Sequence, residues 1–177
     1  MKRTIVGILA VMMITTLYAD DNKVLRAELA PLQFLVGWCW AGQFPDGKRT
    51  DVHCFEAVYG GVHLRDRHAV TGGSTLYRGE TIYSWNGQSS EIGFVYWNSF
   101  GGVSTGTVAP SGDVFVFPDE SYLGPGGETV TVTATWENIT PDGYDSLSVE
   151  TDQDGTKRER RVRYEKRPFT TDPLDAN

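Results

Sequence analysis

The sequence predicts an all-β protein that forms a ten-stranded antiparallel up-and-down barrel with a short N-terminal helix. From residue 34 onward the chain consists of short runs of Val, Ile, Thr and aromatic residues, which is typical of strands. A short turn follows each run, usually with a glycine, and no helical pattern separates the runs. These features predict an antiparallel meander, which removes its exposed edges by closing into a barrel.

The chain of 177 residues has the length of one domain. Positive residues, an apolar run and the small residue Ala19 predict a signal peptide over residues 1–19, with export to the periplasm or the medium and no transmembrane segment in the mature chain. Residues 20–33 are expected to form a linker and a short helix that ends at Pro31. The barrel is expected over 34–167, followed by a flexible tail over 168–177.

We expect ten strands along the barrel domain. They lie at residues 35–44, 49–59, 62–70, 74–85, 91–98, 102–109, 113–118, 128–138, 143–151 and 157–166.

The first predicted hairpin has the strongest turn signal. Asp46-Gly47 lies between two alternating apolar runs, and a two-residue loop there places Cys39 opposite Cys54. These are the only two cysteines of the chain, and opposed residues of antiparallel strands are close enough for a disulfide. We therefore predict a Cys39–Cys54 disulfide, which fits an oxidising compartment.

Further two-residue turns extend this register. Gly60-Gly61 as a loop places His53 opposite His68, and Gly72-Gly73 as a loop places His68 opposite Tyr77. The aromatic face is then the interior, and the disulfide lies outside. In the later strands, we expect the inward set to comprise Val130, Val132, Ala134, Trp136, Leu147, Val149, Arg158, Arg160, Val162 and Tyr164.

One predicted row across the barrel contains Trp40, His53, His68 and Tyr77, with Asp51 and Asp66 two residues from the histidines on the same face. Such polar groups are costly to bury unless they are paired or hydrated. An aromatic-lined cavity with a few polar groups is the usual composition of a small-molecule site. The expected ligand-binding residues are Trp38, Trp40, His53, Phe55, Asp66, His68, Tyr77, Tyr83, Trp85, Trp136 and Arg160.

We therefore predict an exported barrel that binds a small, largely apolar or amphipathic molecule. Two alternatives remain open. One is an acid–base enzyme (an isomerase, cyclase or hydrolase) with His53, His68, Tyr77 and Asp66 as candidate catalytic residues. The other is a barrel filled by its own side chains, serving as a structural or interaction module of the cell envelope.

Composition and spacing argue against several other classes. The net charge of −7 argues against a nucleic-acid partner, because phosphate binding needs a basic face. Histidines and aspartates on adjacent strands are a weak zinc pattern, so no metal site is predicted. No cofactor is predicted either.

Some local motifs resemble a known group of proteins. Phe34-Leu35-Val36-Gly37-Trp38, Phe55-Glu56-Ala57-Val58-Tyr59-Gly60-Gly61 and Leu64-Arg65-Asp66-Arg67-His68 are similar to motifs of bacterial calycin-like families of unknown function. These families form ten-stranded barrels with the shape of nitrobindin and lipocalins, and the resemblance implies a small-molecule cavity. Nitrobindin-type barrels bind haem through a histidine near the C-terminus. This chain has no histidine after His68, so haem binding is not carried over.

Overall fold

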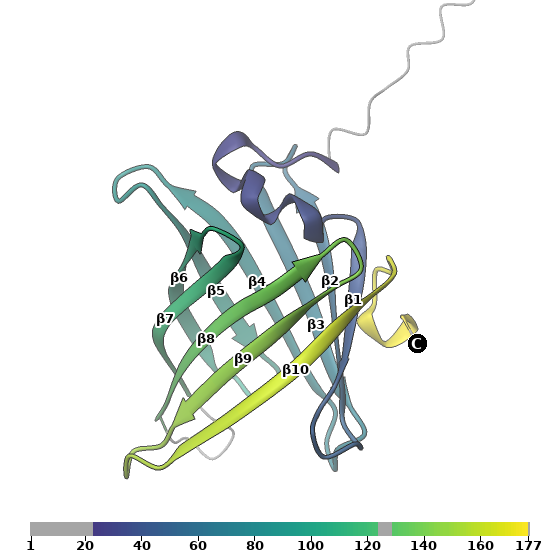
Figure 1. Ribbon diagram of the computed structural model, residues 1–177, viewed down its shortest axis with the longest axis vertical. Helices are drawn as coiled ribbons and strands as arrows, with labels where there is room; N and C mark the ends of the chain where they lie inside the picture. Colours follow the sequence, from purple (N-terminus) through teal and green to yellow (C-terminus); the bar gives the residue numbers. More distant parts are fainter. Residues whose placement is uncertain (1–22, 124–128, 177) are drawn as a thin grey trace, which may run out of the picture.

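The structure, a computed structural model, describes residues 23–123 and 129–176 (Figure 1). The predicted signal peptide lies outside these residues. The chain forms a closed antiparallel barrel in which each strand pairs with its neighbours in sequence and β1 pairs with β10. The strands are β1 (Trp38–Gln43), β2 (Thr50–Val58), β3 (His63–Thr71), β4 (Tyr77–Asn86), β5 (Glu91–Asn98), β6 (Val103–Ser111), β7 (Val114–Leu123), β8 (Thr129–Thr140), β9 (Gly143–Thr151) and β10 (Lys157–Pro168).

The ten-stranded barrel is thus confirmed. Strands β5 and β9 have the predicted bounds, whereas β7 continues to Leu123 instead of ending at residue 118. No helix within residues 23–123 or 129–176 is long and apolar enough to cross a bilayer.

A 3-10 helix, η2 (Ala27–Leu35), lies across one end of the barrel, which we call the closed end (Figure 1). Its leucines Leu29, Leu32 and Leu35 are fully buried in the barrel core. The helix continues through Pro31, where the sequence predicts that it ends. The fixed φ of proline fits a 3-10 helix, so only one backbone hydrogen bond is lost there.

A glycine turn makes room for the segment that leads into η2. Gly61 has φ of +81°, and a Cβ at this position would lie 1.9 Å from the carbonyl oxygen of Val24. The Arg26 backbone N–H donates a hydrogen bond to the Gly61 carbonyl at 2.9 Å. A side chain at position 61 would therefore push the helix away from the barrel end.

The first two hairpin registers agree with the prediction. Cys39 lies opposite Cys54 and forms the disulfide, and His53 lies opposite His68. The third register differs by two residues, because the turn between β3 and β4 takes residues 72–76. His68 therefore lies opposite Gly79, and the expected pairing with Tyr77 is wrong. A shift of two residues leaves every side chain on its predicted face.

Two irregularities reverse the alternation in later strands. The β7–β8 register shifts between Phe117 and Glu120, and the β8–β9 register shifts between Glu137 and Thr140, where Asn138 has φ of 51°. A one-residue bulge turns every later side chain to the opposite face of the sheet. The inward-facing residues of β7 after Phe117, and those of β9, therefore cannot be assigned by continuing the alternation of the residues before each bulge.

The segment after β10 returns along the outer face of β1 and β2, where the sequence predicts a flexible tail. Phe169 and Ala176 pack on the buried disulfide, and the Thr170 backbone N–H contacts the Cys39 sulfur at 3.3 Å. A short 3-10 helix, η3 (Pro173–Asp175), ends this segment. The segment after β10 therefore shields the disulfide from solvent.

Candidate functional site

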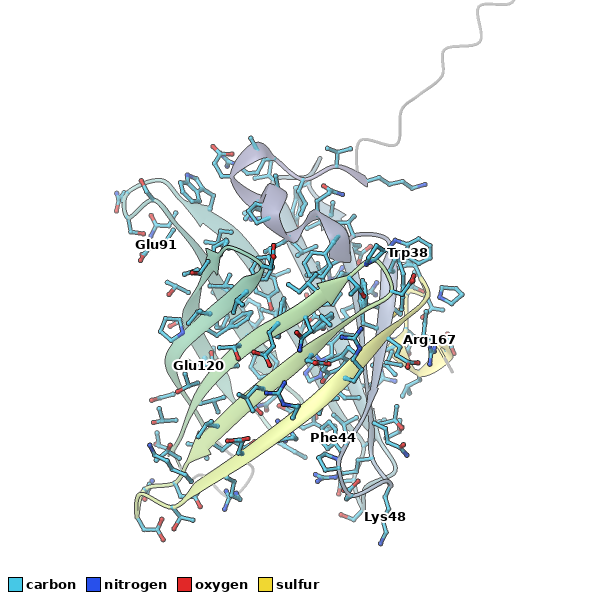
Figure 2. All side chains as sticks on the ribbon, viewed as in Figure 1. Trp38, Phe44, Lys48, Glu91, Glu120 and Arg167 are labelled. Atoms are coloured by element: carbon cyan, nitrogen blue, oxygen red, sulfur yellow. A yellow bond between two sulfur atoms is a disulfide. The ribbon has the colours of Figure 1, made fainter. Side chains whose placement is uncertain are left out.

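The interior of the barrel is filled at the closed end and hollow toward the opposite end, which we call the mouth end. A cavity of about 770 Å³ occupies the hollow part, within the usual range of small-molecule pockets. Its lining reaches Phe44, Thr75 and Phe100, which lie in the β1–β2, β3–β4 and β5–β6 turns. Figure 2 shows Phe44 and Lys48 at this end, with Trp38 and Glu91 at the other.

The predicted ligand-binding residues divide between the two parts. Those that line the cavity are His53, Asp66, His68, Tyr77, Tyr83, Trp136 and Arg160. Trp40 and Phe55 are fully buried in the core at the closed end, and Trp85 packs against the same core. Trp38 is 40% exposed beyond that core, with the Lys166 Nζ atom 3.9 Å from its ring centroid. These four side chains do not line the cavity.

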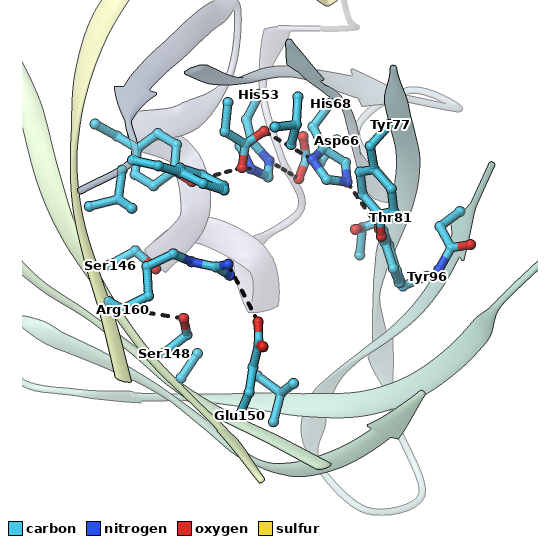
Figure 3. Close-up of a pocket in the computed structure, with 18 of the residues that line it drawn as sticks. His53, Asp66, His68, Tyr77, Thr81, Tyr96, Ser146, Ser148, Glu150 and Arg160 are labelled. Atoms are coloured by element: carbon cyan, nitrogen blue, oxygen red, sulfur yellow. Dashed lines mark hydrogen bonds and ion pairs between the residues drawn. The ribbon is translucent and has the colours of Figure 1, made fainter. Parts of the chain in front are cut away.

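One wall of the cavity carries a connected set of polar side chains, which we call the histidine network (Figure 3). It consists of Asp51, His53, Asp66, His68, Tyr77, Tyr96 and Tyr164. The strand alternation of β2 and β3 points Asp51, His53, Asp66 and His68 inward from adjacent strands. The two imidazole rings stack with centroids 4.5 Å apart and an interplanar angle of 14°.

Asp51 is the centre of this network and is only 6% exposed. Its carboxylate lies 3.1 Å from His53 Nε2 and 3.1 Å from His68 Nδ1, and it accepts a 2.9 Å hydrogen bond from the Tyr164 hydroxyl. Burial acts to raise the pKa of Asp51. The charges and hydrogen bonds of the two imidazoles outweigh burial and hold this pKa well below its ordinary value. Asp51 is therefore ionised.

The second carboxylate, Asp66, fixes the other side of His53. Asp66 is 2% exposed, and its Oδ2 lies 2.8 Å from His53 Nδ1. Burial acts to lower the pKa of His53, but the charges and hydrogen bonds of Asp51 and Asp66 together raise it well above its ordinary value. With no metal bound, His53 is therefore an imidazolium held between two carboxylates.

Two tyrosines extend the network toward the mouth end. The Tyr96 hydroxyl lies 3.1 Å from His68 Nε2, and the hydroxyls of Tyr77 and Tyr96 are hydrogen-bonded to each other. Burial raises the pKa of both tyrosines, so their hydroxyls stay protonated at neutral pH. A hydrogen-bonded path therefore leads from the buried carboxylates to the wider part of the cavity.

The position of the His68 ring depends on Gly79. It lies opposite His68 in the register, and a Cβ there would lie 2.2 Å from His68 Nε2 and 2.6 Å from Tyr96 Cε2. The absence of a side chain therefore lets His68 lie flat against β4 and reach Tyr96.

The opposite wall of the cavity comes from β9 and β10. Figure 3 shows Arg160, Ser148 and Glu150 across the cavity from the histidines. Arg160 Nη1 lies 3.4 Å from Glu150 Oε1, and the guanidinium lies over the Phe44 ring at 4.7 Å. The inward direction of Arg160 agrees with the prediction. Arg158 lies two residues away on the same face of β10, but its side chain is 59% exposed and pairs with Asp152 and Glu150 beyond the cavity lining.

The prediction that Leu147 and Val149 face inward is wrong. The residues of β9 that line the cavity are Tyr144, Ser146, Ser148 and Glu150. The expectation assumed that apolar side chains point inward, but this part of the interior is a polar cavity wall. Val130, Val132, Ala134 and Trp136 of β8 do face inward, and so do Val162 and Tyr164 of β10.

Sequence reasoning missed Tyr96, Glu120 and Glu150. The alternation of Ile92, Phe94 and Tyr96 along β5 could have identified Tyr96 as a cavity residue, because the inward face of β5 continues that of β4. Glu120 turns inward only because of the β7 bulge, whose one sequence signal is Pro118, since a proline inside a strand is typical of a bulge. Burial raises the pKa of Glu120, which accepts a 3.3 Å hydrogen bond from Ser104.

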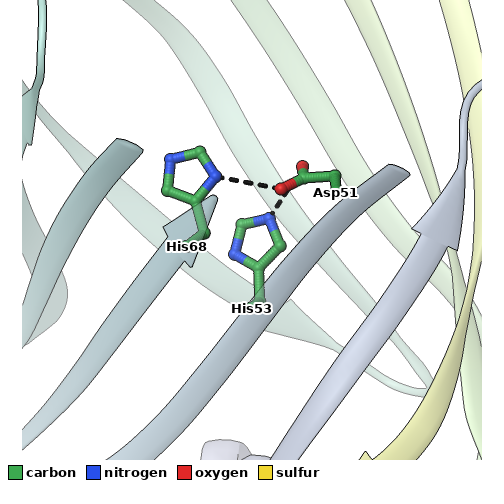
Figure 4. A group of neighbouring side chains, drawn as sticks. All are labelled: Asp51, His53 and His68. Atoms are coloured by element: carbon green, nitrogen blue, oxygen red, sulfur yellow. Dashed lines mark hydrogen bonds and ion pairs between the residues drawn. The ribbon is translucent and has the colours of Figure 1, made fainter. Parts of the chain in front are cut away.

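Asp51, His53 and His68 also have the composition of a metal-binding group (Figure 4). Each offers one ligand atom, and these atoms all lie within 4.8 Å of one another. Within residues 23–123 and 129–176, this is the one set of three or more such residues that meets this distance.

A search of protein-family models found no match for this sequence, and a search of curated proteins found none either. The chemistry of the site therefore has to be inferred from its own residues.

We predict that Gly79→Ala displaces His68 and Tyr96 and destabilises the protein by about 1–3 kcal/mol, as overpacked sites do. Chemical denaturation measures the loss. Gly93→Ala is the matched control, because its Cβ would meet only the Gly106 carbonyl oxygen, at 3.7 Å. Equal stability of the two variants would contradict the close approach of His68 to β4.

We also predict that Glu120 makes stability dependent on pH. A raised folded-state pKa favours the protonated carboxyl, so stability falls as pH rises from the ordinary glutamate value of about 4.3 to the raised value. Glu120→Gln removes this fall and is therefore more stable than the wild type at neutral pH. Denaturation between about pH 4 and pH 8 tests this.

The control for this experiment is Glu91→Gln, at an exposed position of β5. A stability difference between Glu120→Gln and the wild type that does not change with pH would show that Glu120 does not titrate in this way.

Proposed function

We propose that this barrel binds a small amphipathic molecule inside its cavity. The observation that carries the proposal is the division of the lining into apolar and polar parts. Phe94, Phe117, Trp136 and Tyr83 supply aromatic surface, while the histidine network and Arg160 supply polar groups on facing walls. An apolar ligand body with a hydrogen-bonding or charged end would fit such a lining.

The resemblance of the first four strands to calycin-like families of unknown function supports this proposal by analogy only. We also propose export, on the basis of the apolar N-terminal segment and the disulfide. The mass of the mature chain, isolated from its own source, tests whether residues 1–19 are removed.

Filling the cavity should abolish binding. Ala134 is a small residue of β8 in the cavity lining, so Ala134→Trp places a large ring where the ligand would lie. The probe is N-phenyl-1-naphthylamine, a neutral dye that combines an apolar ring system with one polar N–H group. We expect saturable fluorescence enhancement with the wild type, and binding weaker by about tenfold or more, or about 1.4 kcal/mol, with Ala134→Trp.

Thr135→Trp is the matched control, because the adjacent residue points to the outer face of the same strand. It should bind the probe as the wild type does. Wild-type binding without saturation, or equal affinity of the wild type and Ala134→Trp, would refute a ligand site in this cavity.

Acid–base catalysis is a second candidate function, because an unbroken hydrogen-bonded chain links Asp66, His53, Asp51, His68, Tyr96 and Tyr77. Such a chain can move a proton between the buried carboxylates and a cavity ligand. Mass spectrometry identifies any compound that co-purifies. Incubation of that compound with the protein then separates the two functions: a binder returns it unchanged, whereas an enzyme converts it and His68→Phe stops the conversion.

A further inference from the structure

We infer that Asp51, His53 and His68 form a binding site for a divalent transition metal of the zinc type, with its remaining coordination position facing the cavity. The inference does not depend on the amphipathic ligand proposed above, because the metal can be tested alone. It rests on the convergence of three ligand atoms, on the partners of the outer atoms, and on the balance of charge.

The ligand atoms already converge on one point. His68 Nδ1 lies 3.1 Å from Asp51 Oδ1, His53 Nε2 lies 3.1 Å from Asp51 Oδ2, and one ligand atom from each residue lies within 4.8 Å of the others. Ligand atoms of a tetrahedral zinc site, at metal distances of about 2.0–2.1 Å, lie about 3.3 Å from one another. Small rotations of these side chains would therefore admit the ion, with no change in the register of β2 and β3.

The outer atom of each histidine already has a hydrogen-bond partner. His53 Nδ1 lies 2.8 Å from Asp66, and His68 Nε2 lies 3.1 Å from the Tyr96 hydroxyl. Metal-bound histidines commonly donate their second N–H to a carboxylate or another oxygen, which fixes the tautomer and the ring direction. Here both rings are held so that the opposite nitrogen points to Asp51.

Tyr164 orients the third ligand. Its hydroxyl donates a 2.9 Å hydrogen bond to Asp51 Oδ2, so Asp51 Oδ1 can turn to an ion while Oδ2 keeps this partner. Each of the three proposed ligands thus has an outer hydrogen bond that a bound metal would leave intact.

Charge balance supports the same conclusion. Asp51 and Asp66 are 6% and 2% exposed, and Asp66 Oδ1 is buried without a hydrogen-bond partner among the described residues. Burying two carboxylates without an equal positive charge beside them is costly. A divalent cation would balance both negative charges while the two imidazoles stay neutral.

The ligand types indicate the class of ion. Two imidazoles and one carboxylate suit zinc, cobalt and similar ions, whereas calcium and magnesium prefer oxygen ligands alone. Three protein ligands leave a coordination position for water or a bound molecule, which is the arrangement of reactive rather than structural zinc sites. The adjoining cavity provides the space for that additional ligand.

Zinc titration of the chelator-treated, disulfide-bonded protein by calorimetry tests the inference. We expect one zinc ion per chain. Asp66→Asn removes the outer partner of His53 and should weaken zinc binding about 10- to 100-fold. His68→Gln removes a ligand and should weaken zinc binding by more than that. The cysteines do not compete, because they are joined in the disulfide.

His63→Gln is the matched control, since the chain has three histidines and His63 instead bonds Ser84 at 2.7 Å, away from the cluster. It should bind zinc as the wild type does. The inference is wrong if the wild type shows no saturable binding, if His68→Gln binds equally well, or if His63→Gln loses as much affinity as His68→Gln.

A measurement on the wild type alone covers the case in which His68→Gln does not fold. X-ray absorption of the zinc-loaded protein should show two imidazole nitrogens at about 2.0 Å from the ion. A zinc environment with fewer than two imidazoles would overturn the inference.

Discussion

The register of the first hairpin is the constraint on which the candidate site depends. The Asp46-Gly47 turn and the Cys39–Cys54 disulfide both require the same pairing of β1 with β2. Because side chains alternate along a strand, this pairing turns Asp51 and His53 inward, and the next turn brings His68 beside His53. A slip of one residue would place both histidines outside and bring the disulfide into the core.

The histidine network persists inside the barrel because its neighbours compensate for burial. Isolated carboxylates would be costly at this depth, yet both Asp51 and Asp66 face an imidazole. η2 and Trp40 fill the closed end with apolar side chains, and this packing holds in place the strands that carry the network. The barrel therefore combines a packed half, which stabilises the fold, with a hollow half, in which polar groups remain accessible.

The sequence predicted the strand order, the disulfide and the His53–His68 pair, because turn chemistry and alternation are local signals. It could not predict the Gly79 contact, since a turn of five residues looks much like one of two when both contain Gly72-Gly73. Uninterrupted alternation also did not place Glu120 or Glu150, because a bulge in the middle of β7 and another near the end of β8 change which residues face inward. The preference for apolar interiors was misleading for Leu147 in particular, since a cavity wall selects serine and glutamate there.

The arrangement of charge limits what can occupy the cavity. Arg160 is engaged by Glu150 on one wall, so an anionic ligand group would have to compete with a carboxylate already at 3.4 Å. On the facing wall, Asp51 and Asp66 would repel an anion, unless a cation lies between them and the ligand. A metal at Asp51, His53 and His68 would turn that wall from an anion-repelling into an anion-accepting surface. A ligand with a carboxylate or enolate oxygen could then bind the ion while its apolar body lies against Phe117 and Trp136.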